Sequence, residues 1–436
     1  MLNSEWKEFR LGEILAERGY IRGPFGSALK RGEMREKGIP VYEQQHAIYD
    51  HREFRYHVSE EKFEKMKRFS VQTNDLIISC SGTIGRVSII REKDPVGIIS
   101  QALLILRANT SIITPDFLYY YFSSHYGFYA LTSVSSGSVQ VNVANRKIIE
   151  NTKIMLPSIS EQNEITKKLQ AIDDMVSKNR HLITNIEQIL SSLFRSWFID
   201  FDPVKAKSEG KLPYGMNEET AALFPDSFED SELGRIPSGW SVRGLGDVCS
   251  IIKGLSYKGE FIHKPGPALL GIGTIREGGG FRPENVRSYG GPHKERQVLK
   301  PGDTYTALTS QDGLLLGSTA RIPDYFEGTG IATHHVGKVE CNELHMSEFL
   351  YSLTQTQIFI RHCINFSVGT TVYATSPKDV ERLRIVIPTP SVLKRFFQVS
   401  KSFGDLTSRL EIELFTLKVT RDALLPRLMS GELWVS

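Results

Sequence analysis

The sequence has 436 residues, of which 40% are hydrophobic, 10% are aromatic and 24% are charged, and its formal net charge is +3. This length predicts about two to four domains, and the apolar content excludes a disordered chain. No stretch approaches the roughly 18 apolar residues of a membrane helix, and the first residues, MLNSEWKEFR, contain no apolar signal core. The sequence therefore predicts a cytoplasmic protein.

The four cysteines give no sign of a metal site or a disulfide framework. Cys80, Cys249, Cys341 and Cys363 are far apart and form no C-x-x-C pair. We expect ordinary buried thiols at all four positions.

The two halves of the chain repeat each other. Trp6 and the Leu-Gly-acid motif that follows it recur at Trp240, and the Ile-Met-Leu-Pro run ending at Pro157 recurs as Ile-Val-Ile-Pro ending at Pro388. A repeat of this length excludes a solenoid and predicts two similar domains with connecting segments.

The first predicted domain covers residues 1–157 and has a net charge of +4. It is rich in Gly, Ser, Thr and aromatic residues, and short β-like runs such as 75–79 and 102–106 lie between turn residues. Residues 236–390 have the same character and a net charge of +2. Both segments are expected to fold as mixed α+β domains.

The segments that follow each domain have a helical pattern. In residues 158–200 and 390–430 glycine nearly disappears, and apolar side chains recur at alternating spacings of four and three. The first seam begins at Ile165 and ends at Trp197, and the same seam recurs 231 residues later. Each helix of about 40 residues should be roughly 60 Å long.

The ends of both helices carry recognisable capping signals. Ser158 with Glu161 predicts a capping box, and Thr389 followed by Pro390 predicts a cap with a first-turn proline. Gly431 can close the second helix. Residues 158–235 have a net charge of −5, and the part after residue 200 is expected to be an irregular linker.

Two long amphipathic helices most economically bury their seams against each other. Antiparallel packing would relate the two halves by a pseudo-twofold axis. The polar seam residues Asn179, Ser400, Thr407 and Arg421 either specify register, find partners in additional helices, or are simply tolerated. The sequence therefore predicts an α+β protein, with two similar domains joined by two long antiparallel coiled-coil helices.

Motifs for catalysis are nearly absent. There is no G-x-x-x-x-G-K-[ST] loop, and residues 271–273 form a G-x-G without the third glycine of a dinucleotide-binding loop. Residues 202–204 resemble an adenine methyltransferase motif, but the aromatic residue that would stack on a flipped base is missing. Asp324 and Glu327 lack the lysine spacing of a metal-dependent nuclease.

His334 and His335 form the best-looking metal or acid–base pair. Adjacent residues on a strand point to opposite faces, so one site could not easily use both. We therefore expect a chain that catalyses nothing by itself and holds no cofactor and no metal.

Polar loops recur at matching places in the two predicted domains. Gln pairs well with adenine and Arg with guanine, and small residues let the backbone approach phosphates, so these loops suit DNA; the alternative is ordinary solvated loops. The candidate DNA-contacting residues are Ser27, Gln44, Gln45, Ser81, Thr83, Arg86, Ser136, Ser138 and Gln140 in the first domain, and Thr274, Arg276, Ser310, Gln311, His334, Thr370 and Thr371 in the second.

The order of these elements resembles the DNA-specificity (S) subunit of type I restriction–modification systems. The resemblance depends on S-G-T-I-G-R at 81–86, on S-L-F-R-S-W-F at 192–198 and on L-L-P-R-L-M-S-G-E-L at 424–433. The second copy departs from this pattern, with S-Q-D-G at 310–313 in place of the first motif.

The resemblance implies a domain organisation and a set of partners. Two target-recognition domains, 1–157 and 236–390, would each read half of a bipartite sequence in double-stranded DNA. Conserved helical regions at 158–235 and 391–436 would bind two methyltransferase subunits, which supply S-adenosylmethionine binding and adenine methylation. A motor or restriction subunit is a further partner that the resemblance leaves open.

Apolar residues at the ends of the seams are the candidate partner-binding residues. They fall at i, i+1, i+4 and i+5, which makes a stripe too wide for a single partner helix. The alternative is that they only cap the intramolecular coiled coil. The residues are Phe194, Trp197 and Phe198 on the first helix and Leu425 and Met429 on the second.

Two other classes of protein compete with the DNA-reading subunit. One is a methyltransferase or nuclease with its own recognition domains, which the missing motifs disfavour. The other is a coiled-coil adaptor without a nucleic-acid role, which the matched polar loops of two mildly basic domains disfavour.

Overall fold

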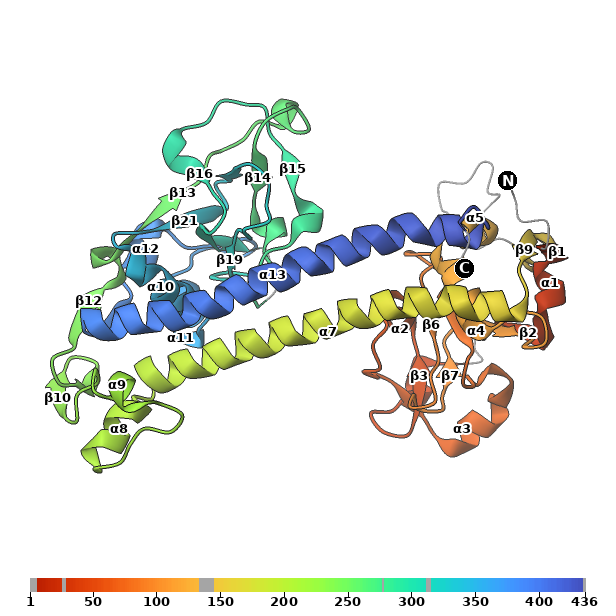
Figure 1. Ribbon diagram of the computed structural model, residues 1–436, viewed down its shortest axis with the longest axis horizontal. Helices are drawn as coiled ribbons and strands as arrows, with labels where there is room; N and C mark the ends of the chain where they lie inside the picture. Colours follow the sequence, from red (N-terminus) through yellow and green to blue (C-terminus); the bar gives the residue numbers. More distant parts are fainter. Residues whose placement is uncertain (1–5, 26–28, 133–144, 277, 311–314, 434–436) are drawn as a thin grey trace. The chain divides into compact units, whose positions relative to one another are not determined.

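The computed structural model describes residues 6–25, 29–132, 145–276, 278–310 and 315–433. The chain divides into two compact units, Met1–Ser177 with Phe415–Ser436, and Lys178–Leu414. Each unit contains one α+β domain and a part of each of the two 40-residue helices, α7 (Ile159–Phe198) and α13 (Pro390–Met429) (Figure 1). The predicted fold class is confirmed.

The first domain is built on two small sheets. The main sheet is antiparallel with the order β2-β8-β5-β6, formed by Leu15–Arg22, Leu103–Ala108, Leu76–Ser79 and Val87–Ile89. The second sheet has the order β4-β3-β7, formed by His57–Val58, Ile39–Tyr42 and Ile98–Ile99, and its strands β3 and β7 are parallel. The strands β5 and β8 are almost wholly buried because apolar side chains cover both of their faces.

Short helices complete this domain, and its first and last strands pair. β1 (Lys7–Arg10) and β9 (Lys153–Leu156) are antiparallel, so the domain closes directly before α7 begins. The helices are α1 (Leu11–Ile14), α2 (Gln44–Tyr49), α3 (Glu60–Lys65), α4 (Pro115–Ser123), α5 (His125–Thr132) and α6 (Arg146–Asn151).

The second domain repeats this topology, with one more strand in its second sheet. Its main sheet, β13-β21-β17-β19, consists of Cys249–Lys253, Val336–Cys341, Thr304–Ala307 and Thr319–Arg321. Its second sheet, β15-β14-β20-β16, consists of Arg287–Ser288, Ala268–Leu270, Gly330–Ala332 and Val298–Leu299, with β14 and β20 parallel. The closing pair is β12 (Ser241–Gly244) with β23 (Arg384–Ile387), and the helices are α10 (Ser347–Thr354), α11 (Gln357–Asn365) and α12 (Pro377–Glu381). The duplication predicted from the sequence is therefore present in the fold.

The two long helices begin and end close to the predicted residues. Ser158 Oγ accepts a hydrogen bond from the Glu161 backbone N–H at 3.3 Å, which is half of a capping box. The Glu161 carboxylate accepts from Trp6 Nε1 at 3.2 Å instead of returning to the cap. Gly431, just beyond α13, has a φ of 72°, the left-handed conformation expected of a closing glycine.

In each unit the two helices pack on each other through the predicted seams. In the first unit Leu169 of α7 shares a core with Leu425 and Leu428 of α13. In the second unit the Trp197 ring of α7 lies 5.9 Å from the Phe396 ring of α13. The start of α7 thus meets the end of α13, and the end of α7 meets the start of α13, so the helices are antiparallel.

The polar seam residues differ in how they are satisfied. Arg421 pairs with Asp173 of α7 at 2.9 Å within the first unit. The Asn179 amide nitrogen and the Ser400 hydroxyl are buried in the second unit without a hydrogen-bond partner among the described residues.

The expectation of an irregular linker after residue 200 is wrong. The segment forms α8 (Asp202–Ser208), α9 (Glu218–Ala221) and the hairpin of β10 (Phe228–Ser231) with β11 (Gly234–Pro237). It folds because Val204 and Phe224 are buried in the core of the second domain. Asn217 also caps α9, since its side-chain oxygen accepts from the Thr220 N–H at 3.0 Å.

The part of the chain that the structure describes contains no helix long and apolar enough to cross a membrane. All four cysteines are free thiols; Cys80, Cys249 and Cys363 are buried and Cys341 is partly buried. No cluster of metal-ligating side chains occurs among the described residues.

Candidate nucleic-acid interface

The loop Ser81–Arg86 connects β5 to β6 in the first domain and is held closed by one side chain. Ser79 Oγ donates to the Thr83 carbonyl at 2.6 Å and accepts from the Arg86 N–H at 2.9 Å. Gly85 adopts a φ of 76°, which favours glycine. The side chains of Ser81, Thr83 and Arg86 are exposed. The loop therefore presents two hydroxyls and a guanidinium from a fixed backbone.

Gln44 and Gln45 begin α2, directly after β3. The Gln44 side-chain oxygen accepts a hydrogen bond from the Ser81 N–H at 3.1 Å, so α2 and the loop meet. Gln45 donates weakly to Glu43 at 3.4 Å. Five of the predicted residues of the first domain thus lie on two adjoining segments.

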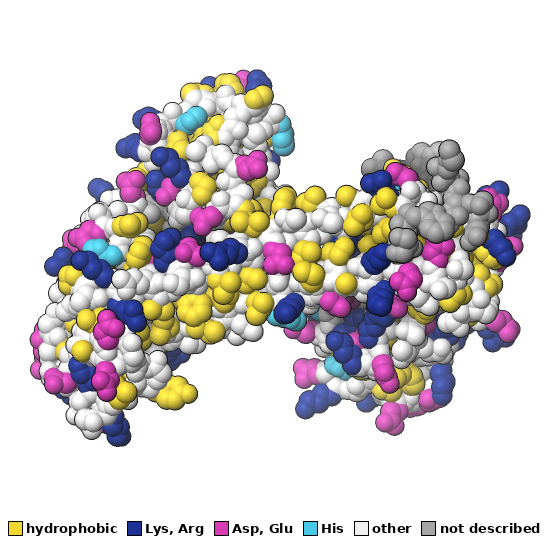
Figure 2. All heavy atoms as spheres, in the orientation of Figure 1, with side chains coloured by type: hydrophobic (Ala, Val, Ile, Leu, Met, Phe, Trp, Pro, Cys, Tyr) yellow, Lys and Arg dark blue, Asp and Glu magenta, His cyan; other side chains and the backbone are white. Residues whose placement is uncertain are grey.

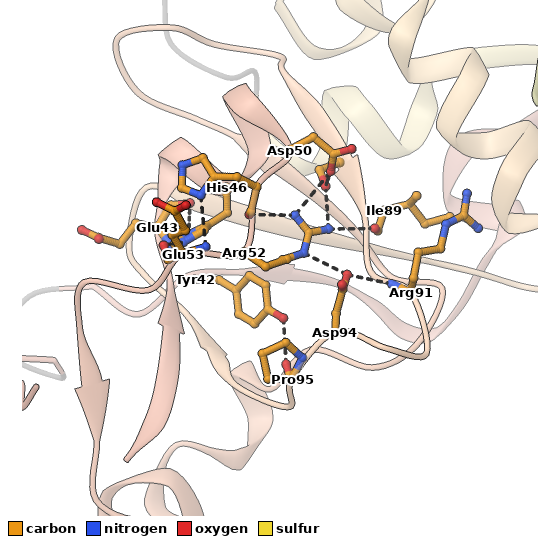
Figure 3. A network of polar contacts seen from close by, with 12 residues as sticks. Tyr42, Glu43, His46, Asp50, Arg52, Glu53, Ile89, Arg91, Asp94 and Pro95 are labelled. Carbon is orange, nitrogen blue, oxygen red and sulfur yellow. Dashed lines mark hydrogen bonds and ion pairs between the residues drawn. The ribbon is translucent and has the colours of Figure 1, made fainter. Parts of the chain in front are cut away.

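A partly buried arginine, Arg52, anchors α2. Arg52 Nε lies 2.9 Å from an Asp94 oxygen, and its terminal nitrogens donate to Ser88 Oγ at 3.0 Å and to the Ile89 carbonyl at 3.1 Å (Figure 3). The side chains of Asp50 and Ser88 are also hydrogen-bonded. This network ties the end of α2 to β6 and so positions the glutamines at its start. No pattern distinguishes Arg52 from the surface arginines around it.

In the second domain a hairpin at 368–374 carries two predicted residues, and the neighbouring strand β18 carries a third. β18 (Thr309–Ser310) pairs with β22 (Tyr373–Ala374), and Val368 bridges to Ala374. Thr370 and Thr371 are exposed at the tip, next to Gly369 with a φ of 117°. Ser310 is buried, and its hydroxyl accepts from the Leu315 N–H at 3.4 Å. The threonines are accessible to a partner, whereas Ser310 supports the hairpin.

The expectation that His334 and His335 point to opposite faces is wrong. They lie in the turn between β20 and β21, not within a strand, and their ring centres are 3.8 Å apart. His335 Nδ1 is hydrogen-bonded to Thr309 Oγ1 at 2.8 Å, which joins this turn to β18. Burial and the neighbouring charges of His334 and Lys253 lower the pKa of His335.

Two predicted residues of the second domain face inward or toward the helices. The Thr274 side chain is buried, donates to the Gly271 carbonyl at 2.7 Å and lies 2.8 Å from the Tyr305 hydroxyl. Arg276 is exposed. Burial raises the pKa of Glu187 on α7 and of Glu411 on α13, and the positive charge of Arg276 acts against this rise. Thr274 is therefore a structural residue, and Arg276 lies close to the helices.

Within each domain, the same two segments are joined by a hydrogen bond. In the first, the Cys80 N–H after β5 donates to the Ala102 carbonyl beyond β7 at 2.9 Å. In the second, the Leu308 N–H after β17 donates to the His335 carbonyl beyond β20, also at 2.9 Å. Each domain thus joins the loop after a central strand of its main sheet to the end of its parallel strand pair. Five predicted residues lie outside the described part of the chain: Ser27, Ser136, Ser138, Gln140 and Gln311.

The five candidate partner-binding residues are buried. Phe194 and Phe198 pack against Phe349 and Phe396 with ring centres 4.9 to 5.8 Å apart. Trp197 is 5% exposed and belongs to the same core, and Leu425 and Met429 belong to the core of the first domain. The apolar stripe is wide at these ends because each helix packs on the other helix and on a domain at once.

A chain with two similar α+β domains, each of which exposes polar side chains on loops beside its sheets, has the architecture of a two-domain recognition protein. The family described as "Type I restriction modification DNA specificity domain" matches residues 3–188. The type I restriction enzyme MjaIX specificity subunit of Methanocaldococcus jannaschii is 26% identical over 384 residues, which cover 84% of this chain and 81% of that protein. The HindI specificity subunit of Haemophilus influenzae is 21% identical over 383 residues, covering 77% and 81%.

A solved structure agrees with the fold. The crystal structure of the type I restriction–modification system S subunit from M. genitalium aligns with a TM-score of 0.54 and 14% identity, over 98% of this chain and 97% of that one. This chain is therefore similar to type I restriction–modification DNA-specificity subunits over most of its length.

Proposed function

We propose that this chain is the DNA-reading subunit of a type I restriction–modification complex. The first domain reads one half of a bipartite sequence in double-stranded DNA, and the second domain reads the other half. The chain contributes recognition, and the methyl transfer belongs to the modification subunits that it binds.

The observation that carries the proposal is that each of two similar domains exposes polar side chains on a loop or hairpin. The first domain exposes Thr83 and Arg86 on its recognition loop, and the second exposes Thr370 and Thr371 at its hairpin tip. Hydroxyl groups contact phosphates or base edges, and arginine pairs with guanine. Two such surfaces in one chain are what a two-part DNA sequence requires.

The helices supply a surface for the modification subunits. Leu182 and Ile189 of α7, both in the second unit, are 39% and 50% exposed, and their spacing of seven residues places them along one face. Hydrophobic side chains are visible over the long helices (Figure 2). We assign this exposed face of α7, and not the buried aromatic cluster, to the binding of two methyltransferase subunits.

Selection from random DNA tests the proposal. The full chain, alone and with its modification subunits, is mixed with a pool of random duplexes, and the bound molecules are sequenced. The proposal expects two short specified segments separated by a gap of unspecified sequence. A continuous specified sequence, or no binding above that of an unrelated protein, would contradict it. Labelled S-adenosylmethionine added to the pure chain tests the enzyme alternative, and no transfer to DNA is expected.

A further inference from the structure

The second domain contains a small cavity where its parallel strands end. β14 and β20 run side by side to Leu270 and Ala332, and a cavity of about 90 Å³ lies just beyond them. Its lining includes Tyr257, Gly271, Asn285, Arg287, Thr333 and His335. Through the hydrogen bond of His335 to Thr309, the cavity adjoins the strand that supports the exposed hairpin.

One side chain that lines the cavity, Thr333, is buried without a hydrogen-bond partner among the described residues. Thr333 is 3% exposed, and the atom without a partner is its hydroxyl oxygen. A Cβ on Gly271 would lie 3.0 Å from this oxygen, so the glycine leaves space beside the buried hydroxyl at the edge of the cavity. An unsatisfied buried hydroxyl destabilises the fold, and a ligand that accepts a hydrogen bond from it would offset that cost.

The lining favours an anion. None of the described residues that line the cavity is acidic, while Arg287 and Asn285 provide N–H donors. The Asn285 amide already donates to the Gly273 carbonyl at 2.8 Å, which orients its side chain beside the cavity. The oxygens of a phosphate accept hydrogen bonds and carry negative charge, which matches these donors.

The segment of sequence that includes most of the cavity lining is basic. Residues 253–300 contain nine Lys or Arg and four Asp or Glu. Within the described residues, none of these nine cations forms an ion pair, whereas Lys62 and Arg52 of the first domain pair with Glu33 and Asp94. Unpaired cations in one segment raise the local concentration of anions.

We propose that this cavity binds one backbone phosphate of the DNA, with the Thr333 hydroxyl and the Arg287 guanidinium as donors. The inference rests on the proposed function and extends it with a contact that carries no sequence information. It also separates roles within the second domain: the hairpin tip reads bases, and the cavity fixes the register of the domain on the duplex.

Three variants test the phosphate site in the full chain. Thr333→Val removes the hydroxyl and keeps the shape, Gly271→Ala fills the cavity at an ordinary extended backbone position with a φ of −130°, and Arg287→Gln removes the charge. Affinity for the random duplex pool should fall by about tenfold in Thr333→Val, because a hydrogen bond to a charged group is lost. The salt slope of binding should decrease by about one in Arg287→Gln. Arg243→Gln, an exposed cation on β12, is the matched control and should bind as the unmodified chain does.

Stability and selection separate the outcomes. The melting temperature of Thr333→Val should stay equal or rise, since an unpaired buried hydroxyl is replaced by a methyl group. Sequences selected by the variants should match those of the unmodified chain. A relaxed preference at one base position would show that the cavity reads a base, and unchanged duplex affinity in all three variants would equally overturn the proposal.

Inorganic phosphate titrated into the chain is a second experiment. Tight binding of free phosphate, with no loss of duplex affinity in the variants, would assign the cavity to a free anion. Failure of the unmodified chain to bind any duplex would instead reject the proposed function itself.

Discussion

The carboxyl group of Glu411 is held away from water by the second unit. Burial is the main cause that raises its pKa to about 7; the charge of Arg276 opposes the shift, and Glu187 and Asp324 reinforce it. The pKa of Glu187 is also raised by burial. A carboxyl with a raised pKa destabilises the folded chain when it ionises.

Stability of the second unit should therefore depend on pH through Glu411. Between about pH 4.5 and pH 7 the folded chain keeps a proton that the unfolded chain has lost, so the free energy of unfolding should fall as the pH rises through this window. Glu411→Gln should flatten this fall and raise stability at pH 8 by roughly 1–3 kcal/mol. Urea denaturation at several pH values measures this. The exposed neighbour Glu413→Gln is the control, and an identical pH dependence in both variants would refute the assignment.

Trp197 should behave as a core residue. Its ring lies 5.0 Å from Phe224 and 5.9 Å from Phe396. Trp197→Ala should lower the free energy of unfolding by about 3–5 kcal/mol. Ile189→Ala, at a half-exposed position of the same helix, should change it little. A stable Trp197→Ala chain that fails to bind its partner would restore the partner-binding role expected from the sequence.

At the scale of elements, α7 has one face that packs in the seam and one that is exposed. Leu169 and Ile186 are buried in the seam, while Leu182 and Ile189 are exposed. A continuous helix can have both because its side chains divide between faces with a period of 3.6 residues. The exposed face is the part of α7 that another chain can still cover.

Leu182→Ser combined with Ile189→Ser tests the exposed face. Co-purification of the modification subunit should weaken by at least about tenfold, because apolar side chains at an interface contribute strongly to affinity. The melting temperature of the isolated chain should remain nearly unchanged. Normal partner binding by this double variant would place the docking surface elsewhere.

Periodic patterns made the long helices predictable from the sequence, and isolated turns were harder to predict. The seam from Ile165 to Trp197 repeats over five heptads. This pattern predicted both the length of α7 and its packing against α13. The helices α8 and α9 are too short to show a period, and their burial depends on contacts such as that of Phe224 with Trp240. Side-chain exposure was equally hidden: Thr274 and Thr370 look alike in sequence, and only the tertiary structure buries the first and exposes the second.

For the whole molecule, the duplication is the feature on which the account depends. Both domains have the same order of strands in the main sheet and the same parallel pair in the second sheet. The repeated sequence motifs predicted this, because each copy must bury equivalent apolar strands.

The most direct test of the account is an exchange of one domain. Residues 1–157 can be replaced as a block by the equivalent domain of a relative, since β1 and β9 pair within this segment. Sequences bound by the chimera are then selected from random duplexes in the presence of the modification subunits. The account predicts that one half of the bipartite sequence changes and the other half stays the same. A change in both halves, or in neither, would contradict it.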